Sequence, residues 1–277
     1  MSSHAYSEDQ LVEQPAVGLF SELGWRVASS RPFTAPLALG AEVWLDGSGL
    51  FGRETKSEVV LVDRLRAALL RLNPGQALET LDMAIDEITR DRAAMSLEAA
   101  NREVYRLLKD GVSVAVPNVR EGGEESVRLR VIDWARPDGN DFLLVSQFSV
   151  VGALYTCRPD LVGFVNGLPW VVIEMKRPGM AARSGFEENL THYKREIPQL
   201  FWYSALLIAS NGTESRVGSL TADWERFFEW KRVEREDEPR RVSLEVMLRG
   251  TCDRGRLLDM VENFTLFQEV PGGLIKL

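Results

Sequence analysis

Residues 160–176 contain the feature that most constrains the fold of this chain: two strongly apolar segments, LVGFV and PWVVI, on either side of Asn-Gly at 166–167. This dipeptide between two apolar runs is a strong signal for a β-hairpin, because both of its residues tolerate the positive φ angles of a tight turn. Charged residues occur only at the ends far from the turn, as Asp160, Glu174 and Lys176. Ionised groups at the ends of buried strands are costly unless they are paired or bind a metal. The hairpin therefore predicts a sheet and a candidate site at its edge.

The pairing register of this hairpin decides whether the three charged residues meet. Glu174 and Lys176 lie two residues apart on one strand, so their side chains leave the same face. A strict two-residue turn would pair Asp160 with Ile173 and place Asp160 on the face opposite to Glu174. A three- or five-residue loop, or one β-bulge, would return Asp160 to that face. A shared site therefore predicts an irregularity in this hairpin.

The hydrophobic periodicity of the rest of the chain changes from helical to strand-like near Gly111. The first helix ends at Gly24 and begins either at a Ser7–Gln10 capping box or near Gln14 with Pro15 in its first turn. The other predicted helices are 57–72, 76–90, 96–109, 186–203, 223–231 and 254–267. The predicted strands are 112–117, 127–134, 141–151, 160–165, 169–176 and 204–210, and loops cover 30–50 and EREDEPRR. This order predicts one α/β domain with helical decoration.

Composition limits the class of protein. No apolar run approaches the roughly 20 residues of a membrane span, and the N-terminus lacks a signal-peptide pattern. Only Cys157 and Cys252, and His4 and His192, are present, which argues against a disulfide framework, a zinc site and His-based catalysis. We therefore expect a cytoplasmic protein without a membrane partner. The net charge of −8 argues mildly against DNA binding by the whole surface, although a local basic patch would suffice.

The residue types of the predicted site fit phosphodiester hydrolysis. Two carboxylates close together repel each other unless a cation lies between them, and hard oxygen ligands favour Mg²⁺. A bound Mg²⁺ polarises a phosphate and lowers the pKa of a bound water. A neighbouring lysine can orient or deprotonate that water and stabilise charge on the phosphate. Asp160, Glu174 and Lys176 are thus candidates for a metal-dependent nuclease centre.

The segment RPDLVGFVNGLPWVVIEMKRPG resembles the nuclease motif of the R (restriction, or motor) subunit of type I restriction enzymes, within the PD-(D/E)xK superfamily. Four further segments resemble the N-terminal region of that subunit: VVLVDRLRAALLRLNP, DFLLVSQFSV, YKREIPQLFWYSALLIASNGTESRVGSLTADWERFFEWK and ENFTLF. The resemblance therefore covers most of 5–270. It implies an α/β, restriction-endonuclease-like mixed β-sheet flanked by helices. It further implies a single nuclease domain over 1–277, with a helical insertion at about 55–110 and a C-terminal helical extension at about 220–277.

The resemblance also implies roles for individual residues. Asp160 and Glu174 would bind the metal, and Lys176 would be the catalytic lysine. Gln199 and Tyr203 match the Gln-xxx-Tyr motif that the family carries on the following helix, where i, i+4 spacing would put both on one face. The superfamily often adds an acidic residue from its first helix, for which Glu13 is the first choice and Glu8 the second. The local basic patch that would receive DNA comprises Arg158, Arg177, Arg183, Lys194 and Arg195.

The resemblance also implies an activity, which is Mg²⁺- or Mn²⁺-dependent cleavage of double-stranded DNA after ATP-driven translocation. A specificity subunit would recognise DNA, and a modification subunit would use S-adenosylmethionine. The helicase-like ATPase lobes are expected to be absent, so the chain would be a fragment, with ATP relevant only to the full-length subunit. The string Gly250-TCDR-Gly255-Arg256 lacks the Lys-Ser/Thr pair of a P-loop. Two alternatives stay open: an inactive DNA-binding or subunit-docking module, and a stand-alone defence or repair nuclease of the same superfamily.

Overall fold

The computed structural model describes residues 9–33, 43–117 and 122–277 and is built around a mixed seven-stranded β-sheet. The strand order is β11-β10-β9-β8-β5-β1-β2. The strands are β1 (Arg26–Ser29), β2 (Val43–Leu45), β5 (Phe142–Ser146), β8 (Leu161–Val165), β9 (Leu168–Met175), β10 (Leu206–Ser210) and β11 (Ser215–Gly218). Strand β9 pairs antiparallel with β8 and parallel with β10, while β1 pairs parallel with both β2 and β5.

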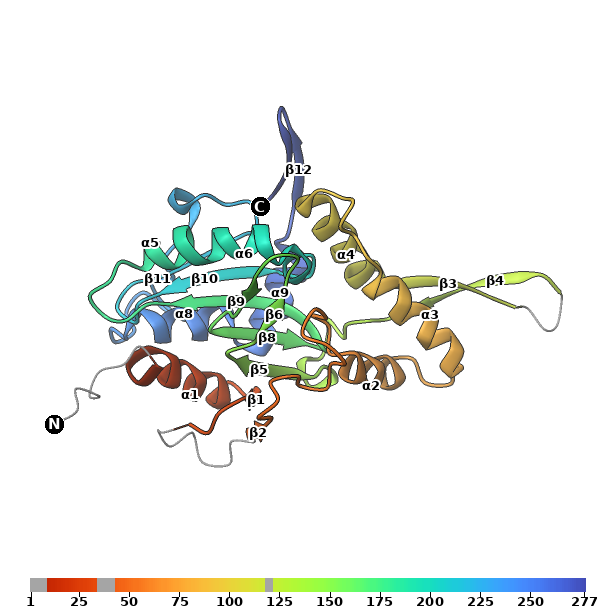
Figure 1. Cartoon of the computed structure of the whole chain (residues 1–277), viewed down its shortest axis with the longest axis horizontal. Coiled ribbons are helices and arrows are strands. Elements are labelled where there is room, and N and C mark those ends of the chain that lie inside the picture. Colours follow the sequence, from red (N-terminus) through yellow and green to blue (C-terminus); the bar gives the residue numbers. More distant parts are fainter. Residues whose placement is uncertain (1–8, 34–42, 118–121) are drawn as a thin grey trace.

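Helices lie on both sides of the central strands (Figure 1). In that view α5 and α6 are above the sheet, and α1 and α8 are below it. The helical elements that cover or extend the sheet are η1 (Asp9–Glu13), α1 (Gln14–Glu22), α5 (Ala182–Ser184), η3 (Gly185–Leu190), α6 (Thr191–Glu196), α7 (Pro198–Phe201), α8 (Ser243–Thr251) and α9 (Arg254–Asn263). Short 3₁₀ turns form η2 (Pro137–Gly139) and η4 (Trp224–Arg226). Strands β8 and β9 are buried along their whole length, which explains why every residue of both strands except Glu174 is apolar or glycine. The predicted mixed α/β sheet flanked by helices is confirmed.

The predicted helical insertion forms three helices, α2 (Val62–Leu72), α3 (Leu78–Thr89) and α4 (Leu97–Asp110). Gly111 ends the last of them with a φ of 85°, a conformation that glycine adopts without strain. Beside it, β3 (Val112–Pro117) and β4 (Glu124–Leu129) form a hairpin that extends away from the sheet in Figure 1. Two further hairpins join β6 (Val150–Val151) to β7 (Thr156–Cys157), and β12 (Phe267–Val270) to β13 (Gly273–Lys276).

Several expectations about the elements need correction. The predicted helix over 186–203 is broken at Ile197, which has a φ of −131° because the ring of Pro198 disfavours helical geometry in the residue before it. The predicted helix over 223–231 is replaced by the short turn η4, and Phe228 forms an antiparallel bridge with Val217. Helix α8 and the short strands β1, β2, β7, β11, β12 and β13 were not predicted, and β2 lies within the range 30–50 that was predicted to be a loop.

The start of the first helix follows one of the two predicted forms. Helix α1 begins at Gln14, and Pro15 lies in its first turn. The alternative cap at Ser7 lies outside the described residues. None of the helices in the three described ranges has the length and apolar character needed to cross a bilayer.

Lys276 fastens the C-terminal hairpin to the body of the protein. Its buried Nζ donates to Oδ1 of Asn101 at 3.0 Å and to the carbonyl oxygen of Ser204 at 2.7 Å. Burial disfavours the charged amine and lowers the pKa of Lys276 to about 7. Part of the fold's stability therefore depends on the protonation of this side chain.

This buried amine predicts a stability that rises with pH. In the unfolded chain Lys276 stays protonated up to its ordinary pKa of 10.5, whereas the folded chain releases the proton near pH 7. Between these values the unfolded state binds more protons, so the free energy of unfolding increases with pH. Between about pH 7.5 and about pH 9.5, urea titrations should show this increase larger by about 2–3 kcal/mol in the wild-type chain than in Lys276→Met. The same pH dependence in both proteins would contradict this assignment.

Candidate active site

A β-bulge sets the register of the β8–β9 hairpin. Asn166 and Gly167 both have positive φ, 50° and 81°, as a tight two-residue turn requires. Next to this turn Phe164 pairs with Pro169, but Gly163 then pairs with Val171, so that the intervening Trp170 is an extra residue on β9. The irregularity that a shared site required is therefore present.

The bulge changes which side chains share a face. Beyond it Leu161 pairs with Ile173, and continuation of this register brings Asp160 opposite Glu174. Without the extra residue Asp160 would be opposite Ile173 and would face away from Glu174. The two carboxylates therefore lie on one face of the sheet, at the edge where β8 begins and β9 ends.

Glu13 joins this edge from the end of η1. It is buried and accepts hydrogen bonds from Oγ of Ser146 and from Nε2 of Gln147, each at 2.9 Å. The same Nε2 of Gln147 donates to Oδ1 of Asp160 at 3.2 Å. Gln147 thus bridges the carboxylates of Glu13 and Asp160. Glu13, the first choice for the acidic residue, therefore lies next to Asp160, while Glu8, the second choice, lies outside the described residues.

The backbone around Asp160 holds its carboxylate in place. Its Oδ2 accepts a hydrogen bond from the backbone N–H of Met175 at 2.8 Å, and its carbonyl accepts one from the N–H of Gln147 at 2.7 Å. Gln147 has a φ of 57°, a conformation that is costly for a residue with a side chain and tends to occur where a site requires it. The orientation of Asp160 is therefore fixed before any ligand binds.

Glu174 and Lys176 extend the site towards η3 and α6. Nζ of Lys176 lies 3.7 Å from Oε1 of Glu174 and donates to Oδ1 of Asn189 at 2.7 Å. Nδ2 of Asn189 in turn donates to the hydroxyl of Tyr193 at 3.2 Å. Burial, followed by the charge of Glu174, raises the pKa of Tyr193, so its hydroxyl stays protonated. Gly185 places η3 directly against Glu174, since a Cβ there would be in contact with Cγ of Glu174, at 3.4 Å.

Sequence reasoning missed four polar residues of this cluster, which are Ser146, Gln147, Asn189 and Tyr193. A signal for two of them was present: the spacing amide-xxx-Tyr occurs twice, as Asn189/Tyr193 and as Gln199/Tyr203. In the first pair, Asn189 accepts a hydrogen bond from Lys176 and donates one to Tyr193.

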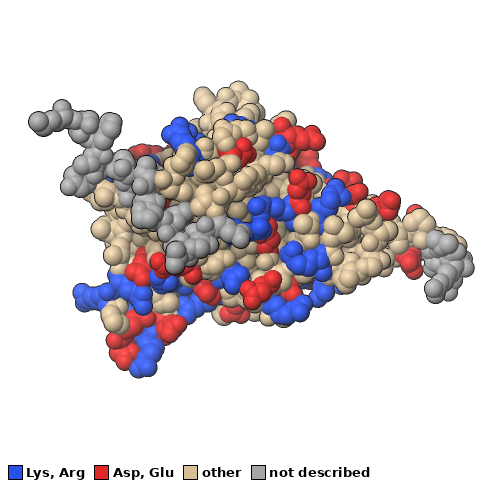
Figure 2. All heavy atoms as spheres, turned by 90° about the horizontal axis from the view of Figure 1, so that it is seen from below, with Lys and Arg blue, Asp and Glu red and all other residues tan. Residues whose placement is uncertain are grey.

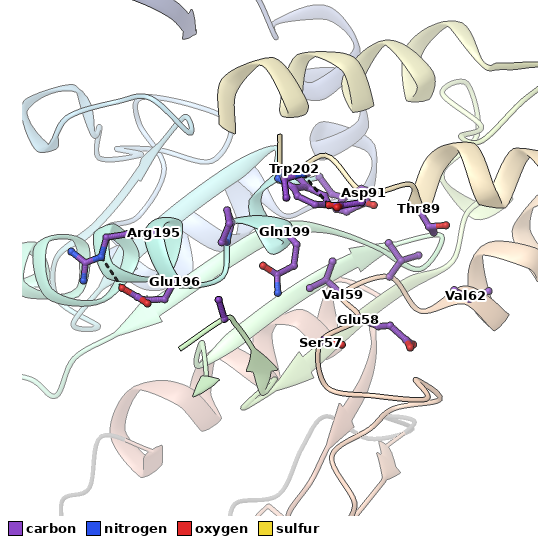
Figure 3. Close-up of a pocket in the computed structure, with 15 residues that line it drawn as sticks. Ser57, Glu58, Val59, Val62, Thr89, Asp91, Arg195, Glu196, Gln199 and Trp202 are labelled. Carbon is purple, nitrogen blue, oxygen red and sulfur yellow. Dashed lines mark hydrogen bonds and ion pairs between the residues drawn. The ribbon is translucent and has the colours of Figure 1, made fainter. Parts of the chain in front are cut away.

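Gln199 and Tyr203 lie elsewhere, and their predicted placement on one helix face is wrong. Helix α7 ends at Phe201, before Tyr203. Gln199 donates to the carbonyl of Val151 at 3.2 Å, and the hydroxyl of Tyr203 donates to that of Ile88 at 3.0 Å. Both line a cavity of about 670 Å³ between the insertion and α7, where Figure 3 shows Gln199 with Trp202 and Val59.

The five basic residues predicted to receive DNA do not form one exposed patch. Arg158, Arg177, Arg183 and Arg195 are exposed, and two of them form ion pairs, Arg183 with Glu187 and Arg195 with Glu196, each at 2.7 Å. Lys194 is partly buried, donates to the carbonyl of Leu220 at 2.7 Å and has its pKa lowered by burial to about 8. On the face drawn in Figure 2, basic and acidic side chains are interspersed.

The donor set of the site has the chemistry that Mg²⁺ prefers, namely carboxylate oxygens. Within the described ranges, no three His, Cys, Asp or Glu side chains gather closely enough to form a complete metal cage. Mg²⁺ usually keeps several waters and is held by one or two carboxylates together with substrate phosphates. The pair Asp160 and Glu174 fits that mode of binding.

The P-loop-like string 250–256 has another structural role. Asp253 caps helix α9, because its Oδ1 accepts hydrogen bonds at 3.1 Å from the backbone N–H groups of Gly255 and Arg256. These N–H groups would otherwise be the ones offered to a phosphate.

Comparison with known proteins finds the family that the sequence resembles. A model of the type I restriction enzyme R protein N terminus matches residues 5–226. The chain is 35% identical over 265 residues to the type I restriction enzyme HindI endonuclease subunit of Haemophilus influenzae, covering 93% of this chain and 24% of that protein. It is 27% identical over 284 residues to a Methanocaldococcus jannaschii protein provisionally named the MjaIXP endonuclease subunit, covering 94% of this chain and 26% of that protein.

The chain therefore spans about a quarter of the length of these relatives. The matched region includes the β8–β9 hairpin and every residue of the carboxylate, lysine and amide cluster described above. This chain belongs to the type I restriction enzyme R protein N-terminal family.

Proposed function

We propose that this chain is a Mg²⁺-dependent endonuclease domain that hydrolyses phosphodiester bonds of double-stranded DNA. The observation that carries the proposal is the bulge at Trp170, which puts Asp160 on the face of Glu174 and Lys176. The family to which the chain belongs, and the word endonuclease in the names of its relatives, support the same activity.

The side chains of the site have separable roles in this proposal. Asp160 and Glu174 would hold Mg²⁺, which when bound supplies Lewis acidity and neutralises phosphate charge. Lys176 would orient the attacking water and stabilise negative charge that develops on the phosphate. Asn189 positions the lysine through the 2.7 Å hydrogen bond to its Nζ. Gln147 keeps the carboxylates of Glu13 and Asp160 in a fixed relation.

From the family we also propose the larger complex in which this activity would occur. In a complete type I restriction enzyme, cleavage would follow ATP-driven translocation by motor lobes of the full-length subunit. Modification and specificity subunits would be the protein partners, with S-adenosylmethionine bound by the modification subunit. We place the complex in the cytoplasm.

Removal of the metal tests the proposal directly. The purified chain is incubated with supercoiled plasmid in Mg²⁺, in Mn²⁺ and in excess EDTA, and the products are separated on agarose gels. We expect open-circular or linear DNA with either metal and none with EDTA, because two carboxylates without a cation repel a phosphate. Metal binding measured by calorimetry without any cleavage would contradict catalysis. That result would favour the inactive DNA-binding or docking module, towards which the net charge of −8 also points.

A further inference from the structure

The hairpin β6–β7 presents apolar side chains to solvent beside the active site. Residues 152–155, here called the apolar tip, connect its two strands. Leu154 is 82% exposed, the largest value for a large hydrophobic side chain among the described residues, and Tyr155 is 56% exposed. Exposed apolar side chains at one place indicate a surface that a partner covers.

The base of this hairpin is held from three directions. The N–H of Val151 donates to the carbonyl of Lys56 at 2.8 Å, and the carbonyl of Val151 accepts from the side chain of Gln199 at 3.2 Å. Gly152 packs so closely on the backbone that a Cβ there would overlap the carbonyl oxygen of Glu196. The tip is thus a fixed projection, which lowers the entropic cost of using it for binding. The side chain of Gln199 therefore has a structural role, because it helps to hold the base of the hairpin.

A short chain of contacts connects the tip to the candidate active site. The ring of Tyr155 lies 5.9 Å from that of His192, measured between centroids. The next residue, Tyr193, accepts a hydrogen bond from Asn189, which holds Lys176. Along the sequence, Asp160 follows Tyr155 by so few residues that the two Cα atoms are at most about 18 Å apart. One turn of B-DNA covers about 34 Å. A duplex with a phosphate at the active site is therefore long enough to reach the tip.

The positive charges beside the tip favour a nucleic acid, rather than a different acidic surface or an apolar surface, as the partner that covers it. Arg158 follows the hairpin directly and is exposed. On the neighbouring helix, Arg195 forms an ion pair with Glu196 at 2.7 Å, but its side chain is 72% exposed, so that its guanidinium can also contact a phosphate. Leucine has no hydrogen-bond donor for phosphates, so it gains from DNA only by burial against bases or sugars. Leucine and other apolar side chains do this as wedges between base steps, and tyrosine does it by stacking.

We infer that the apolar tip binds duplex DNA next to the scissile phosphate, with Leu154 and Tyr155 packed against bases while Arg158 and Arg195 contact phosphates. This inference rests on the proposed nuclease function and deepens it, because it names the element that would position DNA on the active site. Such contacts are sequence-tolerant and would suit cleavage at sites that the domain does not itself recognise.

The test compares the affinity of tip variants for DNA in a background that cannot cleave. Lys176→Ala protein, with and without the double substitution Leu154→Ser/Tyr155→Ser, is titrated into a fluorescent 30-base-pair duplex in Mg²⁺ at low salt. Leu266→Ser is the matched control, since Leu266 is 62% exposed in another part of the surface. We expect the double substitution to weaken binding by about tenfold or more and the control to have no effect. The fluorescence of a duplex that carries 2-aminopurine should increase only when protein with the intact tip is added. The reason is that unstacking of this base relieves the quenching of its fluorescence.

The outcomes separate this inference from the proposed function. If wild-type protein cleaves plasmid but the double substitution leaves DNA affinity unchanged, the inference is wrong and the nuclease proposal stands; the tip would then suit a protein partner. If DNA affinity depends on the tip but wild-type protein does not cleave, the inference stands and the nuclease proposal is wrong. No measurable binding of DNA by the wild-type chain would overturn the inference.

Discussion

Replacing Lys176 with alanine is expected to lower the rate of plasmid cleavage by about 10²–10⁴-fold without unfolding the protein. The physical reason is its position: Nζ lies 3.7 Å from Glu174 and is held by Asn189, so that it faces the space where a phosphate would be bound. Initial rates of nicking in Mg²⁺ measure the effect. Circular dichroism and a urea titration show whether the variant is folded.

Lys231→Ala is the matched control for this experiment. Lys231 is exposed and lies in the segment between η4 and α8, away from the hydrogen bonds of the site. Its loss should change the rate by less than about twofold, since isolated surface charges contribute little. Equal rates for wild-type protein and Lys176→Ala would show that the lysine is not part of the reaction.

Replacing Trp170 with alanine is expected to destabilise the fold by about 3–5 kcal/mol. Trp170 is the extra residue of the bulge, is fully buried and stacks on Trp134 with ring centroids 5.8 Å apart. Its removal would leave a large cavity beneath β9 and take away the packing that holds the bulge. The free energy of unfolding from urea titrations measures the change.

Trp44→Ala provides the comparison for Trp170→Ala. Trp44 lies on the edge strand β2 and is 40% exposed, so less apolar surface is lost when it is removed. A similar loss of stability in both variants would indicate that Trp170 has no special role in the hairpin. Loss of cleavage in Trp170→Ala under conditions where the protein is folded would tie the bulge to the active site.

Much of the fold could be predicted because its signals are local. Asn-Gly between two apolar runs defined the β8–β9 hairpin, and the 3.6-residue periodicity located α2, α3 and α4. The need for an irregularity, either an odd-length loop or a bulge, also followed from register alone. Its position did not, because it depends on the packing of Trp170 against Trp134, a residue distant in the sequence.

The rest of the site could not be predicted for a related reason. The amide-xxx-Tyr spacing occurs at Asn189 and again at Gln199, and only the tertiary structure decides which of the two amides contacts Lys176. The helical pattern continues through Ile197, although the backbone breaks there before Pro198. The short strand β1 has too few residues for a periodic signal and forms because it pairs with β5 and β2.

We propose that Asp160 and Glu174 hold one divalent cation between them. The most direct measurement is an anomalous difference map from crystals of the chain soaked in Mn²⁺. We predict a single peak at this sheet edge, with a carboxylate oxygen of each residue at about 2.1 Å from it, and loss of the peak in Asp160→Asn crystals. A map without a peak there, or with Mn²⁺ bound only at another place, would contradict the claim.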